Sequence, residues 1–261
     1  MNRTVVKWYG ELDMSTVLAL AKREISGLFY SPIGYIVLAI YLLFVGLLFA
    51  LLVMQPGAIA DPGPMFQWNH LILIFVVPFM TMSLFSEEYR SGRIETLRTS
   101  PITDWQLLLG KFLGAMGFYC VVIASSLIFI IILSLFGRPD YMTVLTSYLG
   151  LFLMGLLMVA IGLFFSACTQ HQILAAMSSC VTLVALGILF QAISYFLGAA
   201  LGVSWAWLRT LRHVLRYLAI EPHMVNFSRG LVDSRNVVFF LSGAGLFLFL
   251  TYIVLESRKW R

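Results

Sequence analysis

The longest polar interval in the first two hundred residues lies at positions 87–106, between two strongly apolar runs. Charges on one side and a few apolar residues on the other are typical of a surface helix that contacts another molecule. Tyr89, Ile94 and Leu97 recur at near-helical spacing, which predicts such a helix up to a break at Ser100-Pro101. The charged residues of the interval, which offer ion pairs to a partner, are Glu87, Glu88, Glu95, Asp104, Arg90, Arg93 and Arg98.

The elements on either side of this interval place it at a membrane. The chain is 61% hydrophobic and 11% charged, whereas average soluble domains carry about a quarter charged residues. This composition predicts an all-α, polytopic membrane protein with a single domain over residues 1–261. The net charge of +5 sits at membrane edges and does not indicate nucleic-acid binding. Thr103 and Gln106 have the spacing of a capping box, which predicts the start of a helix.

Six apolar runs reach the length of about 17–25 residues that crosses the hydrocarbon core. Before them, residues 15–30 have an apolar face with Lys22 and Arg23 away from it, which predicts an interfacial helix on the inner membrane surface. Residues 87–105 form a cytoplasmic loop, and residues 198–235 form an extracytoplasmic helical loop. The six runs lie at about 33–54, 69–86, 106–135, 142–166, 173–197 and 236–255.

Within the long outer loop, residues 204–218 carry leucines on one helical face and arginines on another. The segment is too short and too charged to span, so we expect an interfacial or re-entrant helix that ends at Glu221-Pro222. Its basic face, Arg209, Arg212 and Arg216, suits lipid headgroups, which long basic side chains reach by snorkelling. An extracytoplasmic partner protein and an anionic cargo are the alternatives.

The distribution of Lys and Arg gives the orientation. With the N-terminus inside, the cytosolic segments hold eleven of these residues and the outer loops hold six. Because basic residues are enriched in cytoplasmic loops, we expect six spans with both ends of the chain in the cytosol of a bacterium. Lys111 marks the cytosolic end of the third span.

Several kinds of chemistry are missing from the sequence. No Asp, Glu, Lys or Arg lies near the middle of any span, although carriers driven by protons or ions normally keep ionisable groups there. There is no G-x-x-x-x-G-K-[ST] phosphate loop, and the cysteines and methionines lack metal-ligand spacing. We therefore expect no enzyme activity, cofactor or metal in this chain, and an energy source in another subunit. Gly110-x-x-x-Gly114 and Gly198-x-x-x-Gly202 are typical of close helix contacts.

The 87–106 interval also carries a family resemblance. Glu88-x-x-x-Gly92-x-x-Glu95, followed by Thr99-Ser100-Pro101 and Leu109-Gly110-Lys111-Phe112, resembles the cytoplasmic loop of ABC-2 type transporter permeases. Their branch with the gliding-motility and copper-enzyme-maturation permeases is the most similar. Two differences from the family pattern are Arg93, where threonine is usual, and Gln170, near which a basic residue is usual. Further matching segments are Ser31–Tyr35, Phe136–Tyr141 and Phe227–Asp233.

The resemblance implies an exporter subunit in the bacterial cytoplasmic membrane. An ATP-binding-cassette ATPase, which holds the ATP and Mg²⁺, would dock on the 87–105 loop as a coupling helix and on the N-terminal interfacial helix. A second permease copy or a related subunit would complete the membrane part. The alternative is a non-transporting membrane scaffold that passes ATPase-driven motion to a periplasmic accessory protein. The resemblance assigns the ATPase contact to Glu88, Gly92 and Glu95, with Arg93 and Arg98 as supporting charges.

Overall fold

The computed structural model describes residues 14–54, 61–92, 103–137, 139–199 and 206–258. These residues form helices and connecting turns, and no strand occurs among them. Six helical segments are long and apolar enough to cross a membrane, which confirms the fold class predicted from the sequence. They are Pro32–Leu52, Gly63–Arg90, Asp104–Phe136, Tyr141–Cys168, Gln172–Gly198 and Ser234–Ser257.

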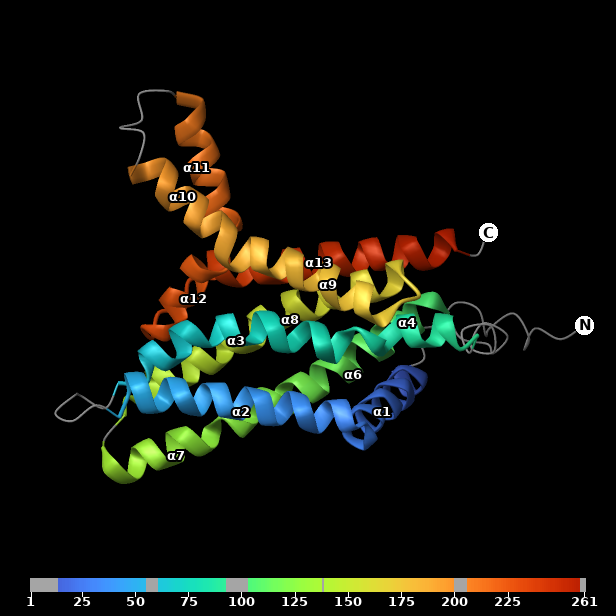
Figure 1. Ribbon diagram of the computed structural model, residues 1–261, viewed down its shortest axis with the longest axis horizontal. Coiled ribbons are helices and arrows are strands. Elements are labelled where there is room, and N and C mark those ends of the chain that lie inside the picture. Colours follow the sequence, from blue (N-terminus) through green and yellow to red (C-terminus); the bar gives the residue numbers. More distant parts are fainter. Residues whose placement is uncertain (1–13, 55–60, 93–102, 138, 200–205, 259–261) are drawn as a thin grey trace, which may run out of the picture.

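The spans form a bundle of roughly parallel helices (Figure 1). Three of them are interrupted, so that each consists of more than one labelled helix. The uninterrupted spans are α2 (Pro32–Leu52), α8 (Tyr141–Cys168) and α13 (Ser234–Ser257). The interrupted ones are α3 (Gly63–Thr81) with α4 (Ser83–Arg90), α6 (Asp104–Ser125) with α7 (Leu127–Phe136), and α9 (Gln172–Val184) with the π-helical turn η2 (Ala185–Leu189) and α10 (Phe190–Ala199).

The most buried span is α8, which packs against α3, α4, α6, α9 and α13. Its glycines allow close packing of large side chains from its neighbours. A Cβ added at Gly155 would lie 2.1 Å from a ring carbon of Tyr119, and one added at Gly162 would lie 2.1 Å from Oγ1 of Thr81. Small residues at such positions let helices approach closely in a membrane, where packing rather than water exclusion drives association.

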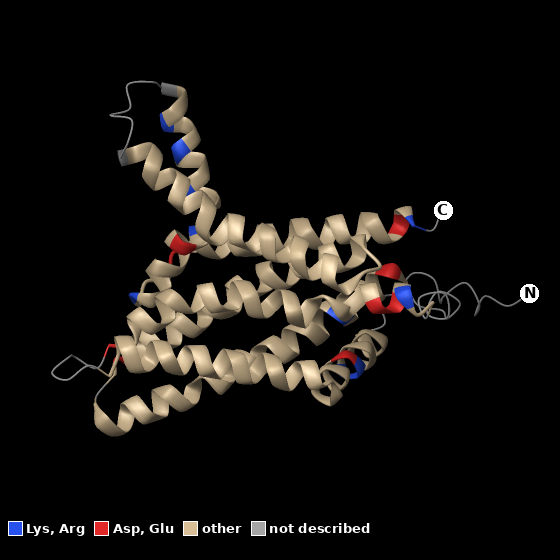
Figure 2. Cartoon of the chain, in the orientation of Figure 1, with Lys and Arg blue, Asp and Glu red and all other residues tan. Residues whose placement is uncertain are grey.

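The two ends of the bundle differ. We call one the α1 end, because α1 (Met14–Tyr30) lies there. The end of α4 and the C-terminal end of α13 lie at the same end, with α13 on the side of the bundle away from α1 (Figure 1). We call the other the α12 end, after the short helix α12 (Glu221–Ser228). Charged residues gather at these two ends and leave the middle of the bundle apolar (Figure 2). At the α12 end, α10 and α11 (Ala206–Leu218) form a hairpin that projects sideways from the bundle (Figure 1).

Local sequence signals explain several helix boundaries. The capping box is confirmed, because the Thr103 hydroxyl accepts from the backbone N–H of Gln106 and the Gln106 side chain accepts from the N–H of Thr103. Ser31 caps α2 with its hydroxyl, which accepts from the backbone N–H of Ile33. Pro32 follows at the first helical position, where a backbone N–H has no intrahelical partner and its absence costs nothing. By contrast, Glu221-Pro222, which the sequence predicts as a helix end, begins α12.

Candidate functional site

A buried lysine organises the α1 end. Lys111 lies on α6, and its side chain is only 1% exposed. Its Nζ atom donates to the carbonyl oxygen of Leu84 at 2.6 Å and lies 2.9 Å from Oε1 of Glu88 and 3.1 Å from Oε1 of Glu24. The ammonium also lies 5.2 Å from the centroid of the Phe85 ring. A buried cation needs such partners, because an unpaired charge in this setting is strongly destabilising.

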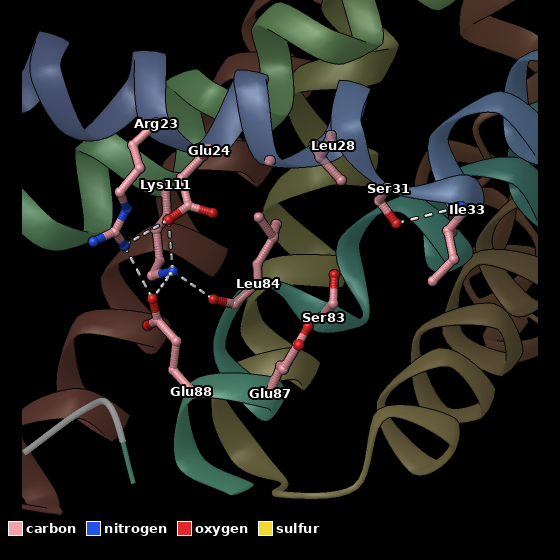
Figure 3. Close-up of a pocket in the computed structure, with 11 residues that line it drawn as sticks. Arg23, Glu24, Leu28, Ser31, Ile33, Ser83, Leu84, Glu87, Glu88 and Lys111 are labelled. Atoms are coloured by element: carbon pink, nitrogen blue, oxygen red, sulfur yellow. Dashed lines mark hydrogen bonds and ion pairs between the residues drawn. The ribbon is translucent and has the colours of Figure 1, made fainter. Parts of the chain in front are cut away.

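A second cation closes the cluster into a ring of alternating charges. Nη2 of Arg23 lies 3.0 Å from Oε1 of Glu24 and 3.1 Å from Oε1 of Glu88, so that each cation contacts both carboxylates (Figure 3). We call Arg23, Glu24, Glu88 and Lys111 the charge ring. The Arg23 side chain is 51% exposed, and its pairs are therefore weaker than those of Lys111, since water and salt screen exposed charges. The ring joins α1, α4 and α6.

A groove of glycines brings α1 close enough to α6 for this contact. A Cβ added at Gly110 would lie 2.6 Å from Cβ of Leu20, and one added at Gly114 would lie 2.6 Å from Cβ of Glu24. Gly117 extends the groove by one turn toward Ile25. The close contact predicted from Gly110-x-x-x-Gly114 is thereby confirmed, with α1 as the helix that fills the groove.

A serine of α8 holds the start of α4. Ser166 Oγ accepts from the backbone N–H groups of Phe85 at 3.0 Å and Ser86 at 3.3 Å, and it donates to the carbonyl of Met82 at 3.0 Å. These contacts satisfy backbone groups that the break between α3 and α4 leaves without intrahelical partners. α4 is therefore fixed to α8 at its start and to the charge ring at its last turn.

The end of α4 is also tied to the last span. The Arg258 guanidinium, which follows α13, lies 4.3 Å from the ring centroid of Tyr89 on α4. Its Nη2 donates to the carbonyl of Cys168, the last residue of α8, at 2.6 Å. The negative end of the helix dipole stabilises a cation at this position. Gly92 then ends the helix in a left-handed conformation, with a φ of 70°, as is common for a glycine after a helix C-terminus.

Beside the charge ring lies a cavity of about 600 Å³. It opens under the elbow between α1 and α2, with Ser31 and Ile33 on one side and Ser83, Leu84 and Glu87 on the other (Figure 3). Among the described residues, no group of three His, Cys, Asp or Glu side chains could hold a metal ion.

The structure brings together some of the residues selected from the sequence. Glu88 and Arg23 meet in the charge ring, and Gly92 follows two residues after the end of α4. Lys22 is exposed on α1 and lies outside the ring. Arg93, Glu95 and Arg98 lie outside the described residues. Arg209, Arg212 and Arg216 lie on α11 at the α12 end, in a second region.

Other residues of the site were missed or misread. Glu24 was not selected, because a single acid on a mostly apolar helix looks like a solvated residue. Lys111 was interpreted only as the marker of a span end. Its position within an apolar run is the signal that could have indicated a buried charge with partners. Ser166 and Arg258 have no sequence signal of this kind, because their contacts are with backbone carbonyls, backbone amides and a ring.

The fold is that of a multi-pass helical membrane protein in which α1, the short helix α4 and the third span meet in the charge ring. The chain matches the family model of the ABC-2 family transporter protein over residues 70–218, more than half of its length. It belongs to the ABC-2 transporter family and is a permease component of an ABC transporter. In this family, ATP hydrolysis resides in separate subunits, and the assembly is dimeric. No curated protein shows significant similarity to the chain.

Proposed function

We propose that this chain is the permease subunit of an exporter and that the α1 end lies in the cytosol. The sequence supports this orientation, because the segments predicted to be cytosolic hold eleven Lys and Arg residues and those predicted to be outside hold six. Both ends of the chain are then cytoplasmic, and the membrane is the bacterial cytoplasmic membrane. Two copies, or one copy with a related permease, line the route of the substrate.

The ATPase subunit, which carries ATP and Mg²⁺, docks on the 87–105 loop and on α1. The observation that supports this proposal most is the charge ring. Because Glu88 on α4 and Glu24 on α1 share one buried cation on α6, a force applied to the loop after α4 moves the interfacial helix and the third span together. Ser166 and Arg258 carry the same displacement to α8 and α13. ATP-driven closure of the two ATPase subunits thus reaches the spans.

The test compares two neighbouring acids on α4. Glu88→Gln removes a charge of the ring, whereas Glu87→Gln removes an exposed charge one residue away. The chain is co-expressed with the ATPase of its own operon, the complex is purified in mild detergent, and ATP hydrolysis is measured. We expect Glu88→Gln to lower the hydrolysis rate of the complex at least tenfold while the ATPase still co-purifies, and Glu87→Gln, in the same docking loop but outside the charge ring, to lower it far less.

Equal activity of the two variants would contradict the role of the charge ring in coupling.

Reconstituted vesicles test the direction of transport. ATP-dependent movement of a solute out of the compartment that contains the α1 end supports export. Hydrolysis that depends on the complex but moves no solute would instead support the scaffold function, in which the work is done on an accessory protein at the α12 end.

A further inference from the structure

Among the described residues, the hairpin of α10 and α11 is joined to the bundle at its base. The backbone N–H of Ile220 donates to the carbonyl of Leu186 at 3.0 Å, within the π-helical turn η2. A π-turn leaves such a carbonyl free of its usual partner. Nε2 of His223 lies 2.9 Å from the carbonyl of Tyr217, near the end of α11. Beyond these contacts the hairpin projects from the bundle (Figure 1).

α11 has three distinct faces. Leu208 and Leu215 are half-buried on the side of α10. Arg212 belongs to this side as well, because a Cβ added at Gly198 would lie 2.7 Å from Cζ of its guanidinium. The basic face predicted from the sequence is therefore reduced, since one of its three arginines packs against α10 and is half-buried.

The second face is apolar and exposed. Trp207, Leu211, Val214 and Leu218 follow each other at intervals of four, three and four residues, and each is between 38% and 59% exposed. At 100° per residue these positions form one stripe along the helix. An exposed stripe of large apolar side chains on a membrane protein marks a surface that another apolar phase covers.

The third face is basic and lies opposite the stripe. It consists of Arg209, His213 and Arg216, all of them exposed. Residues 141–220 contain no Asp or Glu, and no carboxylate of the described chain pairs with Arg209 or Arg216. These charges therefore have no counter-ion from their own chain within the described residues and are open to an external anion.

We propose that α11 lies in the membrane interface and binds anionic phospholipid headgroups through Arg209 and Arg216. A lipid leaflet supplies both things that the helix lacks, an apolar phase for the stripe and anions for the arginines, in the geometry of an interfacial amphipathic helix. The α10–α11 hairpin projects sideways at the α12 end of the bundle (Figure 1), which places α11 near the headgroups. Anionic lipid then fixes the hairpin at the α12 end, next to α12 and α13.

Lipid binding to the full chain tests this directly. The purified protein in a neutral detergent is titrated with dioleoyl-phosphatidylglycerol or dioleoyl-phosphatidylcholine, and bound lipids are counted by native mass spectrometry. We expect preferential retention of phosphatidylglycerol. The double substitution Arg209→Gln with Arg216→Gln should weaken it about 25-fold, since each basic residue near an anionic surface contributes about fivefold. The matched control, Arg229→Gln with Arg235→Gln, removes two other exposed arginines, after the end of α12 and at the start of α13; because neither lies beside the apolar stripe of α11, it should weaken phosphatidylglycerol binding far less.

Replacement of Arg209 and Arg216 by lysine separates charge from folding, and this variant should keep its preference for phosphatidylglycerol. Equal retention of the two lipids by the wild type would overturn the proposal. So would phosphatidylglycerol binding that is unchanged in the glutamine variant. A fall in the dimer fraction on Leu211→Ser, without any change in lipid binding, would show that a second copy covers the stripe and would likewise overturn it.

Discussion

Basic side chains at the two ends of the bundle are in opposite situations. At the α1 end, Lys111 is buried and contacts two carboxylates, while Arg258 contacts a tyrosine ring and a helix C-terminus. At the α12 end, Arg209 and Arg216 are exposed and have no carboxylate partner in the described chain. At the α1 end, Lys111 and Arg258 therefore join helices of the chain. At the α12 end, Arg209 and Arg216 are open to partners outside the chain.

Because of this difference, we expect the two ends to respond differently to substitution. A paired, buried charge is costly to disturb, because the partner that remains is left desolvated. An exposed charge contributes little to stability, because water already solvates it. Substitutions of Lys111, Glu24 or Glu88 should therefore alter the stability and coupling of the protein, and substitutions of Arg209 and Arg216 should alter binding alone.

The largest effect is expected for Lys111→Met. The substitution leaves Glu24 and Glu88 facing each other without their buried cation, which should cost about 3–5 kcal/mol in the free energy of unfolding. Thermal unfolding in detergent measures it, with Lys22→Met on the exposed side of α1 as the control. The triple variant Glu24→Gln, Glu88→Gln, Lys111→Met should recover part of the loss. A single variant as stable as the wild type would contradict the assignment of a tight buried ion pair.

A smaller effect is expected in the glycine groove. Gly114→Ala places a Cβ 2.6 Å from Cβ of Glu24 and should cost about 1–3 kcal/mol, because overpacking forces α1 away from α6. Gly27→Ala, on α1 itself, is the matched control, since a Cβ there meets nothing within 4 Å. The control should be neutral or more stable, owing to the higher helix propensity of alanine. Equal effects of the two variants would show that α1 does not rest on α6.

A still smaller effect is expected at Gly92. Its φ of 70° is unfavourable for residues with a Cβ, so Gly92→Ala should cost about 1 kcal/mol. A Cβ there meets nothing within 4 Å, so the cost is one of backbone conformation alone. Gly92→Asn, which tolerates this conformation better, should be milder. The reverse order of the two variants in an unfolding experiment would count against a helix end at this residue.

The smallest effect on stability is expected on α11. Arg209→Gln with Arg216→Gln should change the free energy of unfolding in lipid-free detergent by less than about 0.5 kcal/mol. The same unfolding measurement applies as for Lys111→Met, so the two ends are compared directly. A loss as large as that of Lys111→Met would mean that the arginines have internal partners, and the contrast between the two ends would disappear.

The sequence predicts those features that depend on local pattern. The six spans follow from runs of apolar residues, the start of α6 from the spacing of Thr103 and Gln106, and the close contact at Gly110 from the glycine repeat. Each of these signals lies within one segment. The family resemblance likewise rests on short motifs in a fixed order, and the match over residues 70–218 confirms it. The narrower branch within the family stays a prediction.

The contacts between segments could not be predicted in the same way. Glu24 and Lys111 are 87 positions apart, and nothing in either segment indicates the partner. The sequence predicts a separate helix from Glu87 onward. In the structure, Glu87 and Glu88 instead belong to α4, which begins at Ser83 and runs to Arg90. Ser166, on another span, satisfies the backbone at the break after α3. Arg212 was assigned to an open basic face, but the absence of a side chain at Gly198 lets it pack on α10.

The proposed orientation of the bundle is tested most directly by a crosslinking experiment that identifies the end in contact with the ATPase. A photo-crosslinking amino acid is placed at Arg90, exposed on the last turn of α4, or at His213, exposed on α11. Each variant is expressed in cells with the partner ATPase and irradiated. We expect a crosslink to the ATPase from position 90 and none from position 213. A crosslink from position 213 alone would contradict the proposed orientation, because the charge ring would then lie on the side of the membrane away from the ATP.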